Sequence, residues 1–342
     1  MKKNKRITIY DLANELGISA SYVSRALNDH PSISDKMKML VKMKAQELNY
    51  RHNSNAANLR MGSSRTIGVV VPKINESFFS NVIAGIEATC FEHKHHLIIC
   101  QSEELFEKEV LAVEKLVRLN VDCIIISLSS QTITFNHLEE VKNNNIQLIQ
   151  FDRTTDKISS HQIINNNKET AYKVVKHLLQ QGYSRIAYIG GPEHTGIYKE
   201  RKAGYLQALK EADISIPYHF VNDNALTREH GSVIARELLQ LKEPPDAIFT
   251  TTDYVAFGVL KTAAGLGIKV PEQLGVFGFA NEMFAEMLTP GLSSVEQFTQ
   301  EIGKRAAGFY FEQLASKKTI SSSKEVISCE LILRGSSLRK QR

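Results

Sequence analysis

The chain has 342 residues, and its 42% hydrophobic and 23% charged residues are close to the globular average, which excludes a fully disordered chain. At about 100–200 residues per domain, this length predicts two or three domains. No apolar run approaches the roughly 18 residues that span a bilayer, and polar residues follow the basic start Met1–Arg6 instead of a signal-peptide core. Four widely spaced cysteines are typical of reduced thiols. We therefore expect a cytoplasmic protein.

The positive charge is concentrated at the start of the chain. Residues 1–65 hold 12 Lys+Arg and 5 Asp+Glu, a net charge of +7, whereas the remainder holds 30 and 32, a net charge of −2. A compact basic segment on a near-neutral body favours a polyanion partner for that segment. A solvated basic tail is the alternative, and the helical pattern of the segment weakens it.

Three short helices are expected in the first 50 residues. The first would begin at Thr8, in an S/T-x-x-D/E cap, and end at Gly17. Ser19 would cap a second helix and Ser34 a third, which runs to about Leu48. The inward faces of the second and third helices are expected to hold Val23, Ala26, Leu27, Met37, Leu40, Val41, Ala45 and Leu48.

The turn between the first two helices is only three residues long, which is typical of a helix-turn-helix. The second helix is then the element that enters a major groove, led by its N-terminal residues. Arg25 could bind a guanine edge in two places, whereas Ser24 and Asn28 suit phosphates or base edges. The alternatives are a solvated Arg25 and a Tyr22 that packs against the third helix.

The head resembles the DNA-binding head of the lactose-repressor (LacI/GalR) family in four ordered segments: Ile7–Ala13, Gly17–Ser19, Val23–Asn28 and Glu47–Tyr50. The resemblance extends over essentially the whole chain and implies a head at residues 1–50, a hinge at 51–65 and a body at 66–342. The spacing and the resemblance together give these DNA-binding candidates: Thr8, Tyr10, Ser19, Ala20, Ser21, Tyr22, Ser24, Arg25, Asn28, Ser34, Asn53, Ala56, Leu59 and Arg60.

The hinge is polar and too short to fold alone, but it could become helical when two copies pair on DNA. The resemblance implies that Leu59 wedges between base pairs in the minor groove and that Ala56 lets the paired hinges approach. A lone linker leucine is the alternative. His52 and Ser54-Asn55 depart from the residues usual in the family.

The body alternates short apolar runs with amphipathic helices, a pattern typical of parallel sheets covered on both faces. Strands are expected at Ile67–Val71, Leu97–Cys100, Cys123–Leu128, Leu148–Phe151, Ile186–Ile189, Phe220–Val221, Ala247–Thr250 and Gly275–Phe279. Helices are expected at Phe78–Cys90, Glu104–Leu119, Thr170–Gln181, Lys199–Ala212, Arg228–Leu241 and Tyr254–Gly265. We therefore predict an α/β body of two doubly wound sheets, one before and one after about residue 160. This matches the two-lobed, periplasmic-binding-protein-like body of the resembled family.

Ligands of such sheets bind at the carboxyl ends of the strands, so a cleft between the lobes is the expected site. Its candidate residues are Phe78, Phe79, Asp152, Arg153, Thr195, Ile197, Arg201, Asp253 and Asn281. Charged groups and aromatic walls suit a small polar effector such as a sugar or nucleoside. Helix packing, structural ion pairs and an Arg201 that merely bridges the lobes are the alternatives. Ala280 and Asn165 stand where the family usually has aspartate, so the effector of known members does not carry over.

Other motifs are weak. His93–His96 reads as a solvated turn without metal partners, and no catalytic set or cofactor motif occurs. We therefore expect a ligand-responsive bacterial transcription regulator, a repressor that binds operator DNA as a homodimer. The sequence near the C-terminus has no repeat of apolar heptads that would form a tetramerising coiled coil, so a dimer is favoured over a tetramer. The rivals are an exported solute-binding protein, which the missing signal peptide opposes, and an enzyme on the same fold, which lacks an acid/base or nucleophile set.

Overall fold

A computed structural model describes residues 7–50, 63–316 and 322–339 and divides the chain into two compact units, residues 1–64 and 65–342. Four of the predicted DNA-binding residues, Asn53, Ala56, Leu59 and Arg60, lie outside the described residues. Among the described residues, no helix is both long and apolar enough to cross a membrane.

The head consists of α1 (Ile9–Leu16), α2 (Ala20–Leu27) and α3 (Asp35–Glu47). Thr8 and Asp11 form the expected capping box, with the Thr8 backbone N–H donating to the Asp11 carboxylate over 2.8 Å. Gly17 ends α1 with a left-handed φ of 62°. A small core holds the head together: Leu12, Ala13, Val23, Ala26, Val41 and Ala45 come from the three helices, and Ile33 comes from the segment before α3.

Two expectations for the third helix need correction. Ser34 stands at the N-cap position of α3, but its side chain makes no capping hydrogen bond. Leu40 is 43% exposed instead of inward, because it shares the outer face of α3 with Met39 and Met43, which are also exposed. The inward face of this helix is therefore narrower than its apolar residues suggest.

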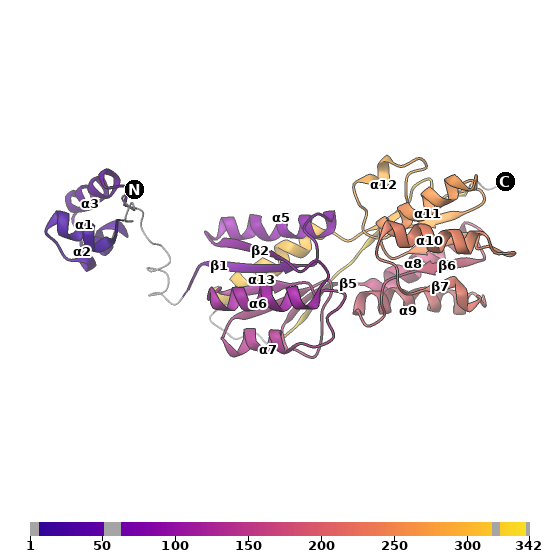
Figure 1. The fold of residues 1–342 in the computed structure, drawn as a ribbon, viewed down its shortest axis with the longest axis horizontal. Coiled ribbons are helices and arrows are strands. Elements are labelled where there is room, and N and C mark those ends of the chain that lie inside the picture. The colour runs from indigo at the N-terminus through magenta and orange to yellow at the C-terminus, as the bar shows by residue number, and fades with distance from the viewer. Residues whose placement is uncertain (1–6, 51–62, 317–321, 340–342) are drawn as a thin grey trace, which may run out of the picture. The chain divides into compact units, whose positions relative to one another are not determined.

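The first lobe of the body (lobe 1) is built on a six-stranded parallel sheet in the order β11-β5-β4-β3-β1-β2. Its strands are β1 (Thr66–Val71), β2 (His96–Gln101), β3 (Cys123–Ile126), β4 (Gln147–Phe151), β5 (His161–Asn165) and β11 (Lys324–Ile327). Helices α5 (Ser77–Glu92) and α13 (Thr299–Ser316) cover one face, and α6 (Phe106–Arg118) and α7 (Asn136–Asn143) cover the other (Figure 1).

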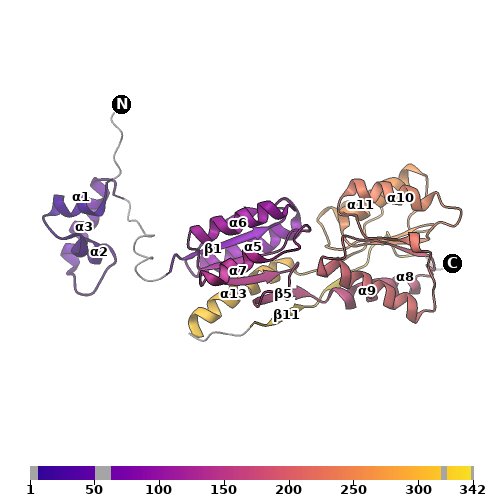
Figure 2. The ribbon, with the colours of Figure 1, turned by 60° about the horizontal axis from the view of Figure 1, so that its bottom comes forward.

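The second lobe (lobe 2) has a four-stranded parallel sheet in the order β7-β6-β8-β9. Its strands are β6 (Ile186–Ile189), β7 (Val221–Asn222), β8 (Ala247–Thr250) and β9 (Gly275–Phe277). Helices α8 (Asn167–Gln180) and α9 (Gly196–Glu211) cover one face, and α10 (Arg228–Leu239) and α11 (Asp253–Gly265) cover the other (Figure 2). The remaining elements are a 3-10 turn (Tyr218–Phe220), α12 (Phe284–Met287) and the antiparallel pair β10 (Ser294–Glu296) and β12 (Glu330–Ile332).

The expected division of the body near residue 160 is wrong, because the chain crosses between the lobes more than once. Strand β5 still belongs to lobe 1, and α13 and β11 return to lobe 1 from lobe 2. Helix α13 crosses α5 so closely that a Cβ at Gly85 would clash with the Gln300 carbonyl, and one at Gly303 would clash with the Val82 carbonyl. This close packing fixes the C-terminal return to the first lobe.

The same helix packs against part of the histidine-rich turn. His93 stacks on Phe311 with ring centroids 3.8 Å apart, and the side chain of His95 is only 7% exposed. His93, Lys94 and His96 nevertheless remain exposed and His95 is half-buried, so the turn is largely solvated, as expected. Within the described residues, no group of three His, Cys, Asp or Glu residues is placed to hold a metal ion.

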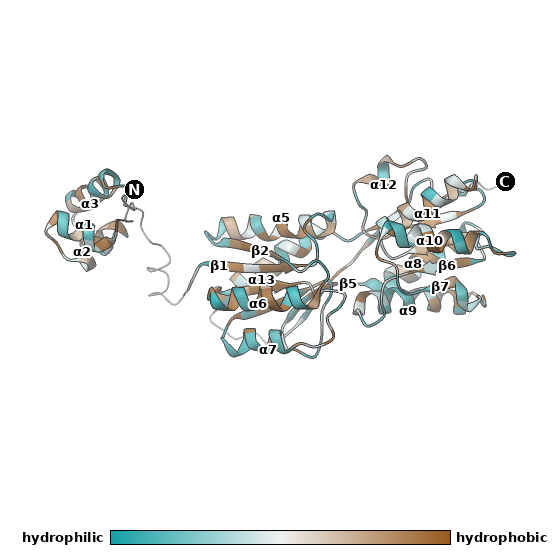
Figure 3. Ribbon diagram, viewed as in Figure 1, coloured by the Kyte–Doolittle hydropathy of each residue, from teal (hydrophilic) through white to brown (hydrophobic). Residues whose placement is uncertain are grey.

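The core of the body follows the predicted patterning. Strand β1 is hydrophobic along its length, whereas α6 and α9 mix hydrophobic and hydrophilic residues (Figure 3). Such strands are covered on both faces, so the polar residues that follow them are left at the carboxyl edge of each sheet.

Candidate operator-reading head and effector pocket

Helix α2 presents a polar face that its caps hold in place. The Ser19 hydroxyl accepts the Tyr22 backbone N–H over 3.2 Å, and the Asn28 side chain donates to the Ser24 carbonyl over 2.8 Å. Arg25 is exposed and forms no ion pair with any described residue. Its guanidinium lies 5.9 Å from the Tyr22 ring centroid, a distance typical of a cation–π contact.

Other predicted head residues are also accessible. Ser21 is exposed, Ala20 is half-buried, and Tyr10 on α1 is 67% exposed. Tyr22 is half-buried against the head core, so part of its surface packs and part remains available. Thr8 and Ser34 are exposed at the starts of their helices, where backbone N–H groups favour phosphate oxygens.

A pocket lies between the lobes, at the carboxyl edges of both sheets. Seven of the nine predicted residues line it: Phe78, Phe79, Asp152, Arg153, Ile197, Arg201 and Asp253. The other lining residues are not among these nine: Lys73, Glu76, Glu104, Tyr198, Leu226, Thr251, Thr252, Tyr254, Phe279, Ala280, Glu282 and Gln297. Most of them follow strands β1, β2, β7, β8 and β9, so the strand-end rule could have found them.

The structure does not bring the two remaining predicted residues to this pocket. Thr195 lines a neighbouring cavity together with His194. The Asn281 amide is turned toward β10, where it donates to Glu296 over 2.8 Å and accepts from Arg334 over 2.9 Å. Its position follows from Ala280, whose φ of 125° redirects the backbone just before it.

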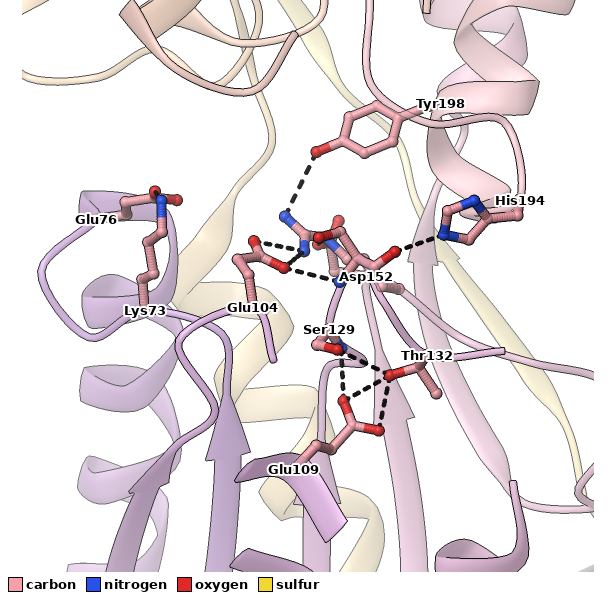
Figure 4. Close-up of polar contacts among 11 residues, drawn as sticks. Lys73, Glu76, Glu104, Glu109, Ser129, Thr132, Asp152, His194 and Tyr198 are labelled. Carbon is pink, nitrogen blue, oxygen red and sulfur yellow. Dashed lines mark hydrogen bonds and ion pairs between the residues drawn. The ribbon is translucent and has the colours of Figure 1, made fainter. Parts of the chain in front are cut away.

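Arg153 is held at one wall of the pocket by a dense set of contacts. Its Nη1 donates to both Glu104 carboxylate oxygens over 2.8 and 2.7 Å, and its Nη2 donates to the Tyr198 hydroxyl over 3.4 Å (Figure 4). Burial alone would raise the pKa of the Glu104 carboxyl, but the Arg153 guanidinium and the Ser130 backbone N–H hold it below its ordinary value.

Arg201 is oriented from the opposite lobe. Its guanidinium carbon lies 3.6 Å from the Phe279 ring centroid, its Nε donates to Asn167 over 2.8 Å, and its Nη1 donates to the Thr251 carbonyl over 2.8 Å. Among the described residues, Arg201 Nη2 has no hydrogen-bond partner. Because two of its nitrogens are already fixed, Arg201 can offer the third to a ligand with little loss of side-chain entropy.

Two buried carboxyls of lobe 2 complete the pocket. Asp253 accepts the Ser294 hydroxyl over 2.6 Å and the Glu282 backbone N–H over 2.8 Å, and burial raises its pKa to about 6. Burial also raises the pKa of Glu282. The Glu282 carboxylate accepts the Ser77 hydroxyl and the Ser77 and Phe78 backbone N–H groups, so lobe 2 caps a helix of lobe 1.

Comparisons with known proteins agree with this architecture. Residues 8–53 match the bacterial regulatory proteins of the lacI family, and residues 175–337 match a periplasmic binding protein-like domain. The HTH-type transcriptional repressor CytR of Escherichia coli (strain K12) is 30% identical over 335 residues, which cover 98% of this chain and 97% of CytR. The chain belongs to the LacI family.

Further LacI-family relatives match over similar lengths. The catabolite control protein A of Priestia megaterium is 30% identical over 93% of this chain and 95% of its own. A crystal structure of the lac repressor dimer bound to operator and the anti-inducer ONPF matches 98% of this chain and 100% of that chain, with a TM-score of 0.85 at 22% identity, and so supports the fold.

Membership of the LacI family makes the chain a helix-turn-helix transcription regulator rather than an enzyme. CytR is a helix-turn-helix repressor, and the lac repressor in the matched crystal structure is a dimer bound to operator and an anti-inducer. The predicted function class and partners are thereby confirmed, and the identity of the effector is left to the chemistry of the pocket.

Proposed function

We propose that this regulator is a homodimeric repressor in which residues 1–50 read the operator, residues 51–65 form the hinge and residues 66–342 bind the effector. We further propose that the effector is a small uncharged polyhydroxylated molecule, a sugar or a nucleoside. The charge and shape of the pocket between the lobes carry this second proposal.

The pocket holds more carboxylates than cations. Its lining includes the acidic residues Glu76, Glu104, Asp152, Asp253 and Glu282 and the basic residues Lys73, Arg153 and Arg201. The cations are largely satisfied within the protein, since Lys73 pairs with Glu76 over 3.0 Å and Arg153 pairs with Glu104. A phosphorylated ligand would meet uncompensated negative charge, whereas hydroxyl groups can donate to the carboxylates.

Aromatic and apolar side chains of the pocket would bind the apolar face of the effector. Phe78, Tyr254 and Phe279 line the same pocket together with Ile197 and Leu226. Such surfaces stack against the apolar face of a sugar ring or against a nucleobase, while Arg201 and Asp152 fix its orientation. The combination favours a ligand with one flat apolar face and an edge of hydroxyl groups.

Thermal shift of the full chain tests the effector class with matched pairs, each sugar against its phosphate and each nucleoside against its nucleotide. An uncharged ligand at about 100 times its Kd should stabilise the protein by about 2.7 kcal/mol. Arg201→Lys should weaken that stabilisation, and Arg236→Gln, an exposed arginine on α10, should not. Stabilisation by only the phosphorylated members would refute the proposed class.

A further inference from the structure

The body has direct side-chain contacts between its lobes on both α5 and α9. At α5, lobe 2 caps the helix through Glu282. At the start of α9, His194 Nε2 donates to the Ser130 carbonyl of lobe 1, and the Tyr198 hydroxyl four residues later accepts from Arg153 of lobe 1. Two neighbouring residues of lobe 2 thus dock on one small surface of lobe 1 (Figure 4).

Glu104 organises the surface that receives them. Its carboxylate accepts the Ser130 backbone N–H over 2.7 Å in addition to Arg153, so it fixes the partner of His194 and the partner of Tyr198 at once. Glu103 and Glu104 both have a left-handed φ, of 53° and 63°. Such backbone is costly for residues other than glycine and persists only where surrounding contacts determine it.

A second carboxylate, that of Glu109, also binds the loop that contains Ser129 and Ser130. Glu109 is fully buried and accepts the Ser129 backbone N–H over 2.5 Å, the Thr132 hydroxyl over 2.9 Å and His137 Nε2 over 2.8 Å. The loop that carries the Ser130 carbonyl is therefore rigid in lobe 1. A rigid acceptor makes the hydrogen bond from His194 sensitive to any movement of lobe 2 against lobe 1.

We propose that His194–Ser130 and Tyr198–Arg153 form an inter-lobe clasp that sets the equilibrium between open and closed lobes, with Glu104 as its positioning residue. Because Arg153 also lines the effector pocket, the clasp lies where a ligand can bias it. The clasp itself is a property of the ligand-free chain. It therefore stands or falls independently of the effector class proposed above.

Hydrogen exchange of the full ligand-free chain, followed by mass spectrometry, tests the clasp. The measured quantity is the exchange rate of two backbone amides outside the clasp that report opening of the lobes. The Ser77 and Phe78 backbone N–H groups bond to Glu282 across the lobes, so they exchange when the lobes open. His194→Ala removes one hydrogen bond and should speed exchange of these amides about fivefold, which corresponds to about 1 kcal/mol. His219→Ala, an exposed histidine of the same lobe, should leave the rate unchanged.

Conservative variants separate the clasp from general destabilisation. His194→Gln keeps an N–H donor and should restore most of the protection that His194→Ala loses. Glu104→Gln should speed exchange at Ser77 and Phe78, whereas Glu103→Gln, whose partner is the surface residue Lys108, should not. Equal exchange of these two amides in wild type and His194→Ala, or equal exchange in the Ala and Gln variants, would overturn the proposal.

Discussion

Replacing Arg25 by alanine tests the link between the head and operator specificity. Arg25 is exposed, makes no ion pair with a described residue and lies 5.9 Å from the Tyr22 ring centroid, so its loss should change the stability of the head by no more than about 0.5 kcal/mol. A bidentate contact of arginine with guanine contributes about 1–3 kcal/mol of discrimination. A dimer loses two such contacts, which gives about 2–6 kcal/mol, or roughly 30-fold to 20,000-fold in operator affinity.

Fluorescence anisotropy with operator and random duplexes at one salt concentration measures both affinities. The variant should lose affinity for the operator while its affinity for random DNA falls by less than about tenfold, because phosphate contacts carry nonspecific binding. Arg236→Ala, on the surface of α10, provides the control. An unchanged ratio of operator to random affinity would show that Arg25 does not read a base.

Three stability predictions follow from the backbone and from burial. Ala280→Gly should raise the free energy of unfolding by about 1 kcal/mol, because the φ of 125° is strained for alanine, and chemical denaturation measures it. Gly303→Ala should lower the free energy of unfolding by about 1–3 kcal/mol, because the new Cβ would clash with the Val82 carbonyl. Gly308→Ala in the same helix has open space around the new Cβ and should leave the free energy of unfolding unchanged. Burial raises the pKa of Asp253 to about 6, so its contribution to stability falls as pH rises from about 4 to 6, and Asp253→Asn should flatten that part of a Tm profile.

The head could be predicted from sequence because its signals are local. The Thr8 cap, the left-handed Gly17 and the three-residue turn each act within a few residues, and the structure reproduces them. The exposure of Leu40 escaped prediction, because the helical period alone does not say how wide the buried face of a small three-helix core is.

The errors in the body come from contacts between distant segments. Helix α13 packs through small residues such as Gly303 and Ala307, so its apolar face is hard to recognise from the sequence. The stacking of His93 on Phe311 likewise joins residues far apart in the chain. In the pocket, the strand-end rule found Asp152 and Arg201. Glu104 follows β2, a strand end from which no candidate was taken, and it pairs with Arg153.

The DNA-binding head and the effector pocket differ in charge, and this difference predicts that salt weakens DNA binding but not effector binding. The first 65 residues carry a net charge of +7, and a protein that makes 6–10 phosphate contacts loses about 10³–10⁵ in DNA affinity between 50 and 200 mM salt. In the pocket, Lys73 is paired with Glu76 and Arg153 with Glu104, and an uncharged ligand releases no counterions there. Operator affinity measured by anisotropy should therefore fall steeply over this range, while the thermal shift produced by a stabilising sugar or nucleoside should stay within about 0.5 kcal/mol. A ligand response that weakens as steeply as DNA binding would show that the effector is itself charged, because only a charged ligand would share the ionic-strength dependence of the head.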